Sequence, residues 1–394
     1  MRSISIFGAT GSIGESTFDL IRRAGGAEAF RTVALTGGRN IARLAEMARE
    51  LRADVAVTAH EDELPALRAA LAGSGVEAAA GAQAIADAAD RPADWTMSAI
   101  VGAAGLVPGL RALRHGRMLA LANKESLVTA GPLLMQTARD HGATILPVDS
   151  EHSAVFQALT GEDIRAVERV IITASGGPFR DWPLERLAAA TVREAVAHPN
   201  WSMGQRISID SASMFNKGLE LIETREFFGF APDQIEVLVH PQSIVHALVG
   251  FTDGGVMAHL GPPDMRHAIG FALHWPDRGD VPVARLDLAK LGQLTFQAPD
   301  ETRFPALRLA REVMRQRGLT GAAFNAAKEI ALDHFIAGRL AFLEMAAVVE
   351  GVLDRLSGEI GPGGGIPDLD AVLATDQLAR RRADELARSR HRNS

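Results

Sequence analysis

Apolar and polar positions in the N-terminal part of the chain alternate between two periods. Two segments, residues 15–23 and 41–51, place apolar side chains at helical spacing, as Phe18 and Ile21 show. Short apolar runs typical of strands lie around them, at residues 3–7, 31–35, 53–58, 96–101, 118–121 and 144–148. Strands that alternate with helices are typical of a parallel sheet wound in βα units. The pattern therefore predicts an α/β fold that begins with a Rossmann-like domain over residues 1–149.

A different pattern follows, with segments rich in Gly, Pro, Trp and Ser. Apolar runs at residues 169–175, 236–239, 243–249 and 255–259 resemble strands of a mixed or antiparallel sheet. They predict a second, α+β domain over residues 150–274. A turn at Trp275-Pro276 opens a predicted linker over residues 275–300. After Phe304 the spacing is helical nearly to the end, which predicts a C-terminal α-helical domain over residues 301–394.

Composition excludes several classes of function. With 394 residues, 47% of them hydrophobic, the chain is typical of a globular protein of two or three domains. A net charge of −7 gives no electrostatic reason to expect nucleic acid or an anionic membrane as a partner. The absence of Cys excludes disulfides, thiolate metal sites and a Cys nucleophile. No apolar stretch reaches the roughly 20 residues of a membrane span, and the first strand leaves no room for a leader, so we expect a cytoplasmic protein.

A glycine-rich turn formed by Gly8, Gly11 and Gly14 lies directly between the first strand and the first helix. Glycines there let the backbone approach a pyrophosphate, and the helix N-terminus offers it free N–H groups. The alternative is an ordinary tight βα turn. We therefore expect a nucleotide-binding turn.

The end of the second strand indicates which nucleotide. NAD-binding proteins usually place an acid there for the ribose 2′-hydroxyl, but residues 36–40 contain Arg39 and no acid. A guanidinium can pair two oxygens of a 2′-phosphate, so this segment favours NADP(H). The alternative is a solvated Arg in a loop.

Two acids, Asp149 and Glu151, stand at the carboxyl end of the run at 144–148, where open α/β sheets bind ligands. While the backbone stays extended, residues two apart point to the same face, so both carboxylates could hold one ion. The alternative is a pair of acids at the N-terminus of an amphipathic helix over residues 153–159.

Residues 198–220 bring together side chains suited to a phosphate: His198, Ser211, Asn216 and Lys217. Asn216, Glu220 and Glu223 are spaced four and three apart, so they share one helical face. The alternative is that Lys217 merely pairs with Glu220 on the surface. The three carboxylates Asp149, Glu151 and Glu220 beside a phosphate cluster suggest Mg²⁺ or Mn²⁺ holding a phosphorylated substrate.

Three further features support a ligand site. The turn that begins at Ser175 has free N–H groups that could form an anion nest. Lys124 follows another strand end, where it could stabilise negative charge on a substrate oxygen, although most lysines are solvated. Trp201 and Met203, in a segment expected to be exposed, are explained by a mobile lid over the substrate.

Six motifs occur in a fixed order along the chain: GATGSIG, ANKES, DSEHSA, SGGPF, HPNWSMG and SxxxxNKGLE. With them the chain resembles the 1-deoxy-D-xylulose-5-phosphate reductoisomerases over essentially its full length. The resemblance implies an enzyme that depends on NADPH and a divalent metal, acts on a small phosphorylated sugar and forms a homodimer. It also makes the second domain the catalytic one.

The resemblance implies a role for each matching position. The residues implied to contact NADPH are Thr10, Gly11, Ser12, Ile13, Gly38, Arg39, Asn40, Asn123, Glu125 and Gly204. Those implied to hold Mg²⁺ or Mn²⁺ are Asp149, Glu151 and Glu220, which together with Lys124 form the implied catalytic set. Those implied to bind substrate are Lys124, Ser150, Glu151, Ser175, His198, Trp201, Ser211, Asn216, Lys217 and Glu220.

Two positions depart from the family pattern. Arg39 stands where the family often has Lys, which preserves the charge and the expected preference for NADPH. Lys328 stands where Asn is usual. Because Lys328 lies in the C-terminal helices, it puts only a local packing or interface detail in doubt.

The implied reaction rearranges the carbon skeleton of 1-deoxy-D-xylulose 5-phosphate, by a retro-aldol/aldol or an α-ketol route. NADPH then reduces the product to 2-C-methyl-D-erythritol 4-phosphate, in non-mevalonate isoprenoid biosynthesis. Two alternatives remain: an NADP-dependent dehydrogenase of another phosphorylated sugar, and a catalytically silent NADPH-binding regulator. Loss of turnover with a chelator discriminates against the first, and the presence of all three acids argues against the second.

Overall fold

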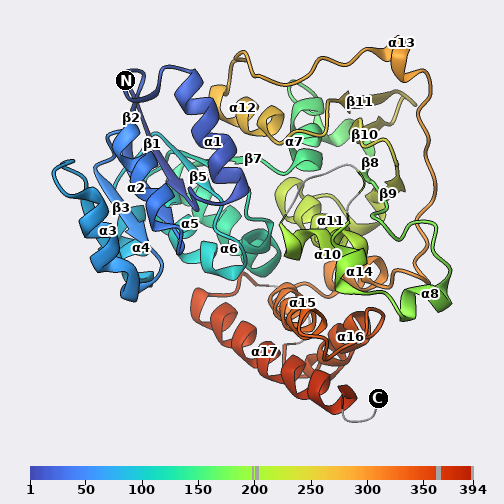
Figure 1. The fold of residues 1–394 in the computed structure, drawn as a ribbon. Helices are drawn as coiled ribbons and strands as arrows, with labels where there is room; N and C mark the ends of the chain where they lie inside the picture. Colours follow the sequence, from blue (N-terminus) through green and yellow to red (C-terminus); the bar gives the residue numbers. More distant parts are fainter. Residues whose placement is uncertain (198, 200–203, 361–364, 392–394) are drawn as a thin grey trace. The chain divides into compact units, whose positions relative to one another are not determined.

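The computed structural model describes the chain except for residue 198 and residues 200–203, 361–364 and 392–394 (Figure 1). The described chain divides into two compact units, each with its own sheet. Unit 1 comprises Met1–Ser126, Leu134–Ser153 and Asp264–Arg285. Unit 2 comprises Leu127–Leu133, Ala154–Pro263 and Leu286–Ser394.

Unit 1 is built on a seven-stranded sheet with the order β4-β3-β2-β1-β5-β6-β7, in which every neighbouring pair is parallel. Its strands are β1 (Arg2–Phe7), β2 (Phe30–Gly37), β3 (Val55–Thr58), β4 (Glu77–Ala80), β5 (Trp95–Ser98), β6 (Met118–Leu121) and β7 (Thr144–Pro147). The predicted parallel sheet is therefore confirmed. The strand order reverses between β1 and β5, which creates the kind of crevice where open α/β sheets bind ligands.

Helices connect these strands, as parallel pairing requires. They are α1 (Ser12–Arg23), α2 (Ile41–Glu50), α3 (Leu64–Leu71), α4 (Ala82–Ala89), α5 (Leu106–Leu113) and α6 (Lys124–His141), with 3₁₀ turns η1 (Gly26–Glu28), η2 (Glu61–Glu63) and η3 (Ala103–Gly105). Helix α6 is kinked at Ala130, two residues before Pro132, a residue that removes a helical hydrogen bond.

One helix of unit 1 comes from much later in the chain. Helix α12 (Arg266–His274) buries Ile269 and Leu273, and the buried Trp95 of β5 donates its indole N–H to the carbonyl oxygen of Ala272 at 2.9 Å. A buried indole needs such a partner, so this bond fixes the helix against the sheet.

Unit 2 contains a four-stranded mixed sheet with the order β11-β10-β8-β9, as the apolar pattern predicts. Its strands are β8 (Val167–Ala174), β9 (Ile235–Val239), β10 (Val245–Phe251) and β11 (Val256–Leu260). Strands β8 and β9 are parallel, whereas β10 is antiparallel to both β8 and β11. The edge strand β11 leaves Val256 and Met257 exposed.

The remaining helices belong to unit 2. They are α7 (Ser150–Ala158), which begins in unit 1, and α8 (Leu184–Ala188), α9 (Val192–Ala195), α10 (Gln205–Ala212), α11 (Phe215–Phe228), α13 (Leu288–Leu291), α14 (Ala306–Gln316), α15 (Thr320–Ile336), α16 (Glu344–Leu356) and α17 (Leu369–His391), with turns η4 (Ile164–Ala166) and η5 (Pro232–Gln234). Helix α15 packs against both α16 and α17 (Figure 1).

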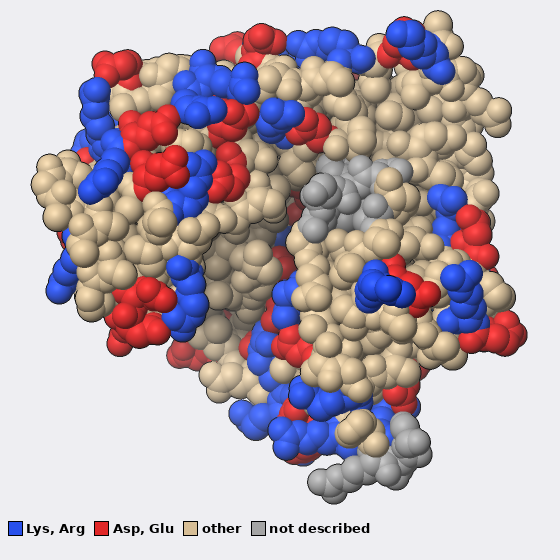
Figure 2. Space-filling view, in the orientation of Figure 1, with Lys and Arg blue, Asp and Glu red and all other residues tan. Residues whose placement is uncertain are grey.

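The C-terminal helices carry charges of both signs. Basic and acidic side chains lie next to one another over this part of the surface (Figure 2). In α17, Arg380 contacts Glu329 of α15 and Asp376, at 2.6 and 2.7 Å. None of the helices that the structure describes is both long enough and apolar enough to span a membrane.

Candidate active site

The glycine-rich turn after β1 has a geometry that only glycine permits at two positions. Gly8 has φ +88°, and a Cβ there would lie 2.5 Å from the carbonyl oxygen of Ala99. A Cβ on Gly14 would lie 2.3 Å from the carbonyl oxygens of both Gly8 and Ala9. Since backbone atoms cannot move aside as a flexible side chain can, the turn requires these glycines.

The same turn leaves the start of α1 open to an anion. Gly11 is the N-cap residue of α1 and provides no side-chain cap. The N–H groups of the first helical turn, which includes Ser12 and Ile13, therefore point toward the carboxyl edge of the sheet, beside Thr10. The residues present fit the pyrophosphate of a dinucleotide at the point where the strand order reverses.

The segment after β2 is tied to the loop after β3. The Thr58 hydroxyl donates to the carbonyl oxygen of Gly38 at 3.0 Å, and the Asn40 side chain caps α2 by accepting from the Arg43 N–H. Arg39 is exposed, and its Nη1 lies 2.9 Å from Asp62 and 3.1 Å from Glu63 of η2. The hydrogen bond that Arg39 donates to Asp62 raises the pKa of Arg39. The sequence did not predict these two acidic partners.

Asn123 joins the carboxyl ends of β5 and β6. Its side-chain oxygen caps α6 by accepting from the Ser126 N–H at 2.8 Å, and its amide donates to the carbonyl oxygen of Gly102, also at 2.8 Å. Glu125 lies in the first turn of the same helix. Both predicted cofactor residues therefore lie at the carboxyl edge of the sheet.

Lys124 and Asp149 form a largely buried ion pair at this edge. Lys124 Nζ lies 2.5 Å from Asp149 Oδ2, and the side chains are only 8% and 12% exposed. Burial alone would raise the pKa of Asp149, but the charge of Lys124 and the nearby His152 outweigh it and lower that pKa. Asp149 is therefore an ionised carboxylate and a suitable metal ligand.

The expected extended backbone at Asp149–Glu151 is wrong, because α7 begins at Ser150. The alternative interpretation, acids at a helix N-terminus, describes the local structure. Asp149 Oδ1 accepts from the Ser150 N–H at 2.9 Å, and the Ser150 hydroxyl donates to Glu151 at 2.5 Å. Asp149 and Glu151 therefore lie at the N-terminus of α7, where the helix dipole favours negative charge.

His152 is a residue of this site that sequence reasoning missed. It is fully buried, and its Nδ1 lies 3.6 Å from Asp149 Oδ2. Its position three residues after Asp149, inside the DSEHSA motif, was the available signal, because a helix brings i and i+3 together.

In unit 2, α11 carries the second predicted group of side chains. Asn216 donates to Glu220 at 2.5 Å, and Lys217 forms an ion pair with the other oxygen of the same carboxylate. The shared helical face is thereby confirmed for Asn216 and Glu220. The alternative of a surface pair is wrong, because Lys217 and Glu220 are 3% and 1% exposed. A buried pair of this kind is retained only with good geometry and further hydrogen bonds.

The turn after β8 lies against α10. Gly176 and Gly177 both have positive φ, at +83° and +64°, and the Gly177 N–H donates to the Ser175 hydroxyl at 3.1 Å. A Cβ on Gly177 would lie 2.9 Å from the carbonyl oxygen of Ser211. The structure therefore brings the predicted anion turn and Ser211 together within unit 2.

Helix α10 is also anchored from the C-terminal part of the chain. Lys328 of α15 forms a buried ion pair with Asp210, the residue before Ser211, at 2.8 Å. Gly204 is the exposed N-cap of α10. His198, Trp201 and Met203 lie outside the described residues.

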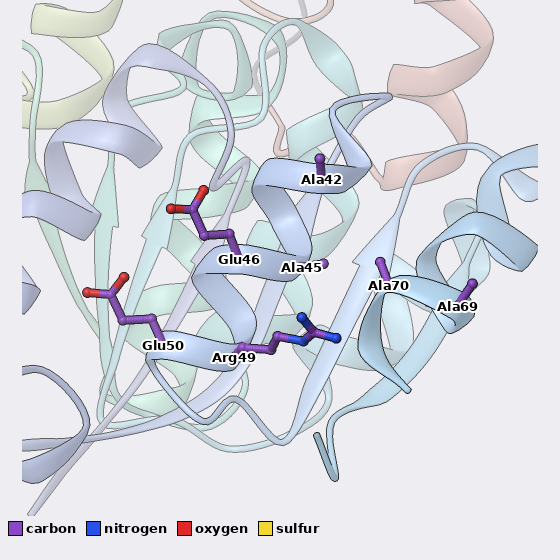
Figure 3. Close-up of a pocket in the computed structure, with 7 residues that line it drawn as sticks. All are labelled: Ala42, Ala45, Glu46, Arg49, Glu50, Ala69 and Ala70. Carbon is purple, nitrogen blue, oxygen red and sulfur yellow. The ribbon is translucent and has the colours of Figure 1, made fainter. Parts of the chain in front are cut away.

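A surface depression elsewhere in unit 1 carries none of this chemistry. It is lined by residues of α2 and α3; the Arg49 side chain extends from α2 toward the side of Ala69 and Ala70, whereas Glu46 and Glu50 point to the other side of α2 (Figure 3). None of the predicted site residues lines it.

Family models and known proteins resemble this chain over nearly its whole length. The model described as 1-deoxy-D-xylulose 5-phosphate reductoisomerase matches residues 4–131. Two C-terminal domain models of the same family match residues 145–228 and 260–382. The 1-deoxy-D-xylulose 5-phosphate reductoisomerase of Cereibacter sphaeroides is 79% identical over 388 residues, with 98% of each chain covered. That of Paracoccus denitrificans is 67% identical over 383 residues, covering 97% of this chain and 98% of the relative.

Solved structures give the same result. The enzyme from Zymomonas mobilis in complex with NADPH superposes with a TM-score of 0.91 at 48% identity, covering 98% of this chain and 99% of the other. A reductoisomerase in complex with NADPH, fosmidomycin and magnesium gives a TM-score of 0.93 at 40% identity, with 98% of each chain covered. The chain therefore belongs to the 1-deoxy-D-xylulose 5-phosphate reductoisomerase family.

Proposed function

We propose that this chain converts 1-deoxy-D-xylulose 5-phosphate into 2-C-methyl-D-erythritol 4-phosphate, using NADPH and a divalent metal. The observation that carries the proposal is full-length membership of a family whose solved structures contain NADPH, magnesium and fosmidomycin. The buried carboxylate–lysine pairs of both units add support, because they supply charged groups suited to a cation and a phosphate.

The proposed metal ligands are Asp149, Glu151 and Glu220. Carboxylate oxygens are ligands that Mg²⁺ and Mn²⁺ accept readily. In each unit a lysine ammonium, Lys124 or Lys217, already contacts one of these carboxylates, which indicates that the oxygens are placed to receive positive charge. His152 beside Asp149 orients that carboxylate in the way that outer partners of metal ligands do.

The proposed phosphate site consists of Ser175, His198, Ser211, Asn216 and Lys217. The positive-φ turn through Gly176 and Gly177 lies against Ser211, which supports placing Ser175 and Ser211 in one anion site. Lys217 adds a positive charge that is shielded from water. Trp201 and Met203 are proposed to cover the bound substrate.

The proposed NADPH site uses the open N-terminus of α1 for the pyrophosphate and Arg39 for the 2′-phosphate. Thr10, Ser12, Ile13, Gly38 and Asn40 line this part, together with Gly11. Asn123, Glu125 and Gly204 complete the proposed set. In the sheet order, β1 and β7 are three strand spacings apart, about 14 Å, so a dinucleotide anchored at β1 can extend toward Asp149.

The chain's own residues prepare the substrate for reaction. When bound, the metal supplies Lewis-acid polarisation of the substrate's carbonyl and hydroxyl, and NADPH supplies a hydride. Asp149 holds the Lys124 ammonium at the carboxyl edge of the sheet, so that it can stabilise negative charge that develops on a substrate oxygen. The Ser150 hydroxyl donates to the Glu151 carboxylate, so this hydroxyl and carboxylate lie together directly after Asp149 in the chain.

Two further properties are proposed. The chain acts as a cytoplasmic enzyme, and it forms a homodimer. The exposed apolar residues Val256 and Met257 on the edge strand β11 support association, because an unpaired strand edge is a template for pairing with another chain. Light scattering of the purified protein measures its mass in solution, and a monomer at micromolar concentration would contradict the dimer.

The test follows NADPH absorbance with 1-deoxy-D-xylulose 5-phosphate, first with Mg²⁺ and then with excess chelator. We expect NADPH consumption only with metal, and a branched polyol phosphate as product. Asp149→Asn and Glu220→Gln should reduce turnover at least about 1000-fold while NADPH affinity changes little. The matched control is Asp54→Asn. Asp54 is a partly exposed acid directly before β3, at the edge of the sheet opposite to the carboxyl edge. Near-native turnover in either site variant would show that the metal assignment is wrong, and chelator-insensitive reduction would favour a metal-independent dehydrogenase.

A further inference from the structure

Two arginines follow β2, and the structure distinguishes them. Arg43 makes two hydrogen bonds to Glu15, at 2.8 and 2.7 Å, contacts Glu46 at 2.8 Å and lies over the Phe18 ring. These contacts use its nitrogens for packing α2 against α1. Arg39, in contrast, is 58% exposed and makes its ion pairs with Asp62 and Glu63 through Nη1 alone. Arg39 is therefore the guanidinium that can exchange partners.

The two acids are fixed beside Arg39 by the backbone. Gly37 of β2 is the register partner of Thr58 of β3, and the Ala59 N–H donates to the carbonyl oxygen of Gly37 at 2.8 Å. The Thr58 hydroxyl also holds the carbonyl of Gly38. The loop that carries Asp62 and Glu63 therefore stays next to the loop that carries Arg39 whether or not a ligand is bound.

We propose that Asp62 and Glu63 are specificity-determining residues that compete with the NADPH 2′-phosphate for Arg39. The inference rests on the proposed function, in which Arg39 receives that phosphate. A 2′-phosphate carries a charge of about −1.5 to −2 at neutral pH. The phosphate either displaces Asp62 and Glu63 from Nη1 or binds the other edge of the guanidinium while the two carboxylates stay nearby. In both cases the acids weaken NADPH binding, whereas NADH has only an uncharged hydroxyl at this position and does not bind more tightly when the acids are removed.

The size of the effect follows from exposure. Asp62 is 66% exposed, so its ion pair is weak and screened by salt. Removing one acid should tighten NADPH binding about two- to fivefold, and removing both about three- to tenfold. Such an effect sets how strongly the enzyme prefers NADPH over NADH and how readily the oxidised cofactor leaves.

The experiment measures the Kd of NADPH and of NADH by calorimetry, using full-length protein without substrate. The variants are Asp62→Asn, Glu63→Gln and the double variant. The matched control is Asp54→Asn, which removes an exposed acid paired with Arg31 at 2.8 Å, at the opposite ends of the same two strands. We expect tighter NADPH binding in the double variant, a smaller gain at high salt, no gain with NADH and no change in the control.

Several outcomes would overturn the inference. Weaker NADPH binding in the double variant would mean that the acids hold Arg39 ready for the phosphate. If NADPH and NADH bound more tightly by the same factor, the change in net charge of the protein would explain the effect. A similar gain in the Asp54→Asn control would have the same meaning. Arg39→Met separates the two proposals: if it leaves the ratio of the NADPH and NADH affinities unchanged, the proposed role of Arg39 is wrong as well. If it lowers that ratio while the acid variants change nothing, only the competition is wrong.

Discussion

Replacing Lys328 with Met should destabilise the protein by removing one half of a buried ion pair. Lys328 Nζ lies 2.8 Å from Asp210 Oδ2, and the side chains are 4% and 9% exposed. Met preserves most of the aliphatic stem, so little cavity is created. The variant leaves the Asp210 carboxylate buried without its cation. Breaking a buried pair in this way typically costs about 3–5 kcal/mol.

The assay is urea unfolding followed by far-ultraviolet circular dichroism, with the midpoint compared between wild type and variant. Lys290→Met is the control, because Lys290 is 86% exposed and pairs with Asp287 at only 3.5 Å. We expect the control to change the free energy of unfolding by less than about 0.5 kcal/mol. The double variant Lys328→Met with Asp210→Leu should recover most of the loss, because an apolar pair replaces an ionic one.

The reasoning would be refuted if Lys328→Met cost less than about 1 kcal/mol, a value typical of an exposed pair. It would also be refuted if the double variant were less stable than the single one. A second readout is the KM for substrate, because Asp210 precedes the proposed phosphate ligand Ser211. We expect KM to rise more than kcat falls.

Two further predictions concern pH and the cofactor turn. Burial alone would raise the pKa of Glu329, but Lys328 and Arg380 outweigh it and lower that pKa. This carboxylate therefore stabilises the fold above its unfolded pKa of about 4.3, and the stabilisation is lost as pH falls through the lowered value. Glu329→Gln should be less stable than wild type at neutral pH, with a gap that closes during acid titration; a constant gap would contradict this. Gly14→Ala should cost about 1–3 kcal/mol and at least about tenfold in NADPH affinity, whereas Gly11→Ala, with its nearest protein atom at 3.4 Å, is the mild control for stability. Equal losses of stability in thermal melts would show that the turn adapts.

Strands with large apolar residues could be predicted from the sequence, and one without them could not. The run at residues 118–121 has the bounds of β6, and the predicted run at 144–148 extends one residue beyond β7. Strand β4 was missed because Glu77 is followed by three alanines, which have a low preference for strands. It forms because β3 offers it a parallel edge, with Val55 opposite Glu77.

The candidate site was predictable where its polar side chains lie within one sequence motif. Asn216, Lys217 and Glu220 are one helical turn apart, and the structure joins them in hydrogen bonds and an ion pair. Contacts between distant segments left no such signal. Lys328 and Asp210 are 118 residues apart, and Arg39 and Asp62 are 23 residues apart. Periodicity reports which face of an element is buried, but it does not report which charged residue of another element meets it.

The lysine partners of the proposed ligands connect stability with function. The buried acids Asp149 and Glu220 are each paired with a lysine, Lys124 or Lys217, and such pairing offsets the cost of burying a charge. Asp149→Asn therefore removes a proposed metal ligand and also leaves the Lys124 ammonium without its carboxylate. Loss of turnover alone would not separate these effects. NADPH affinity separates both effects from a loss of folding, because the cofactor turn at β1 lies three strands from β7 in the sheet order and senses whether unit 1 is folded. Unchanged NADPH affinity with abolished turnover would therefore assign the loss to the Asp149–Lys124 pair and not to unfolding of unit 1.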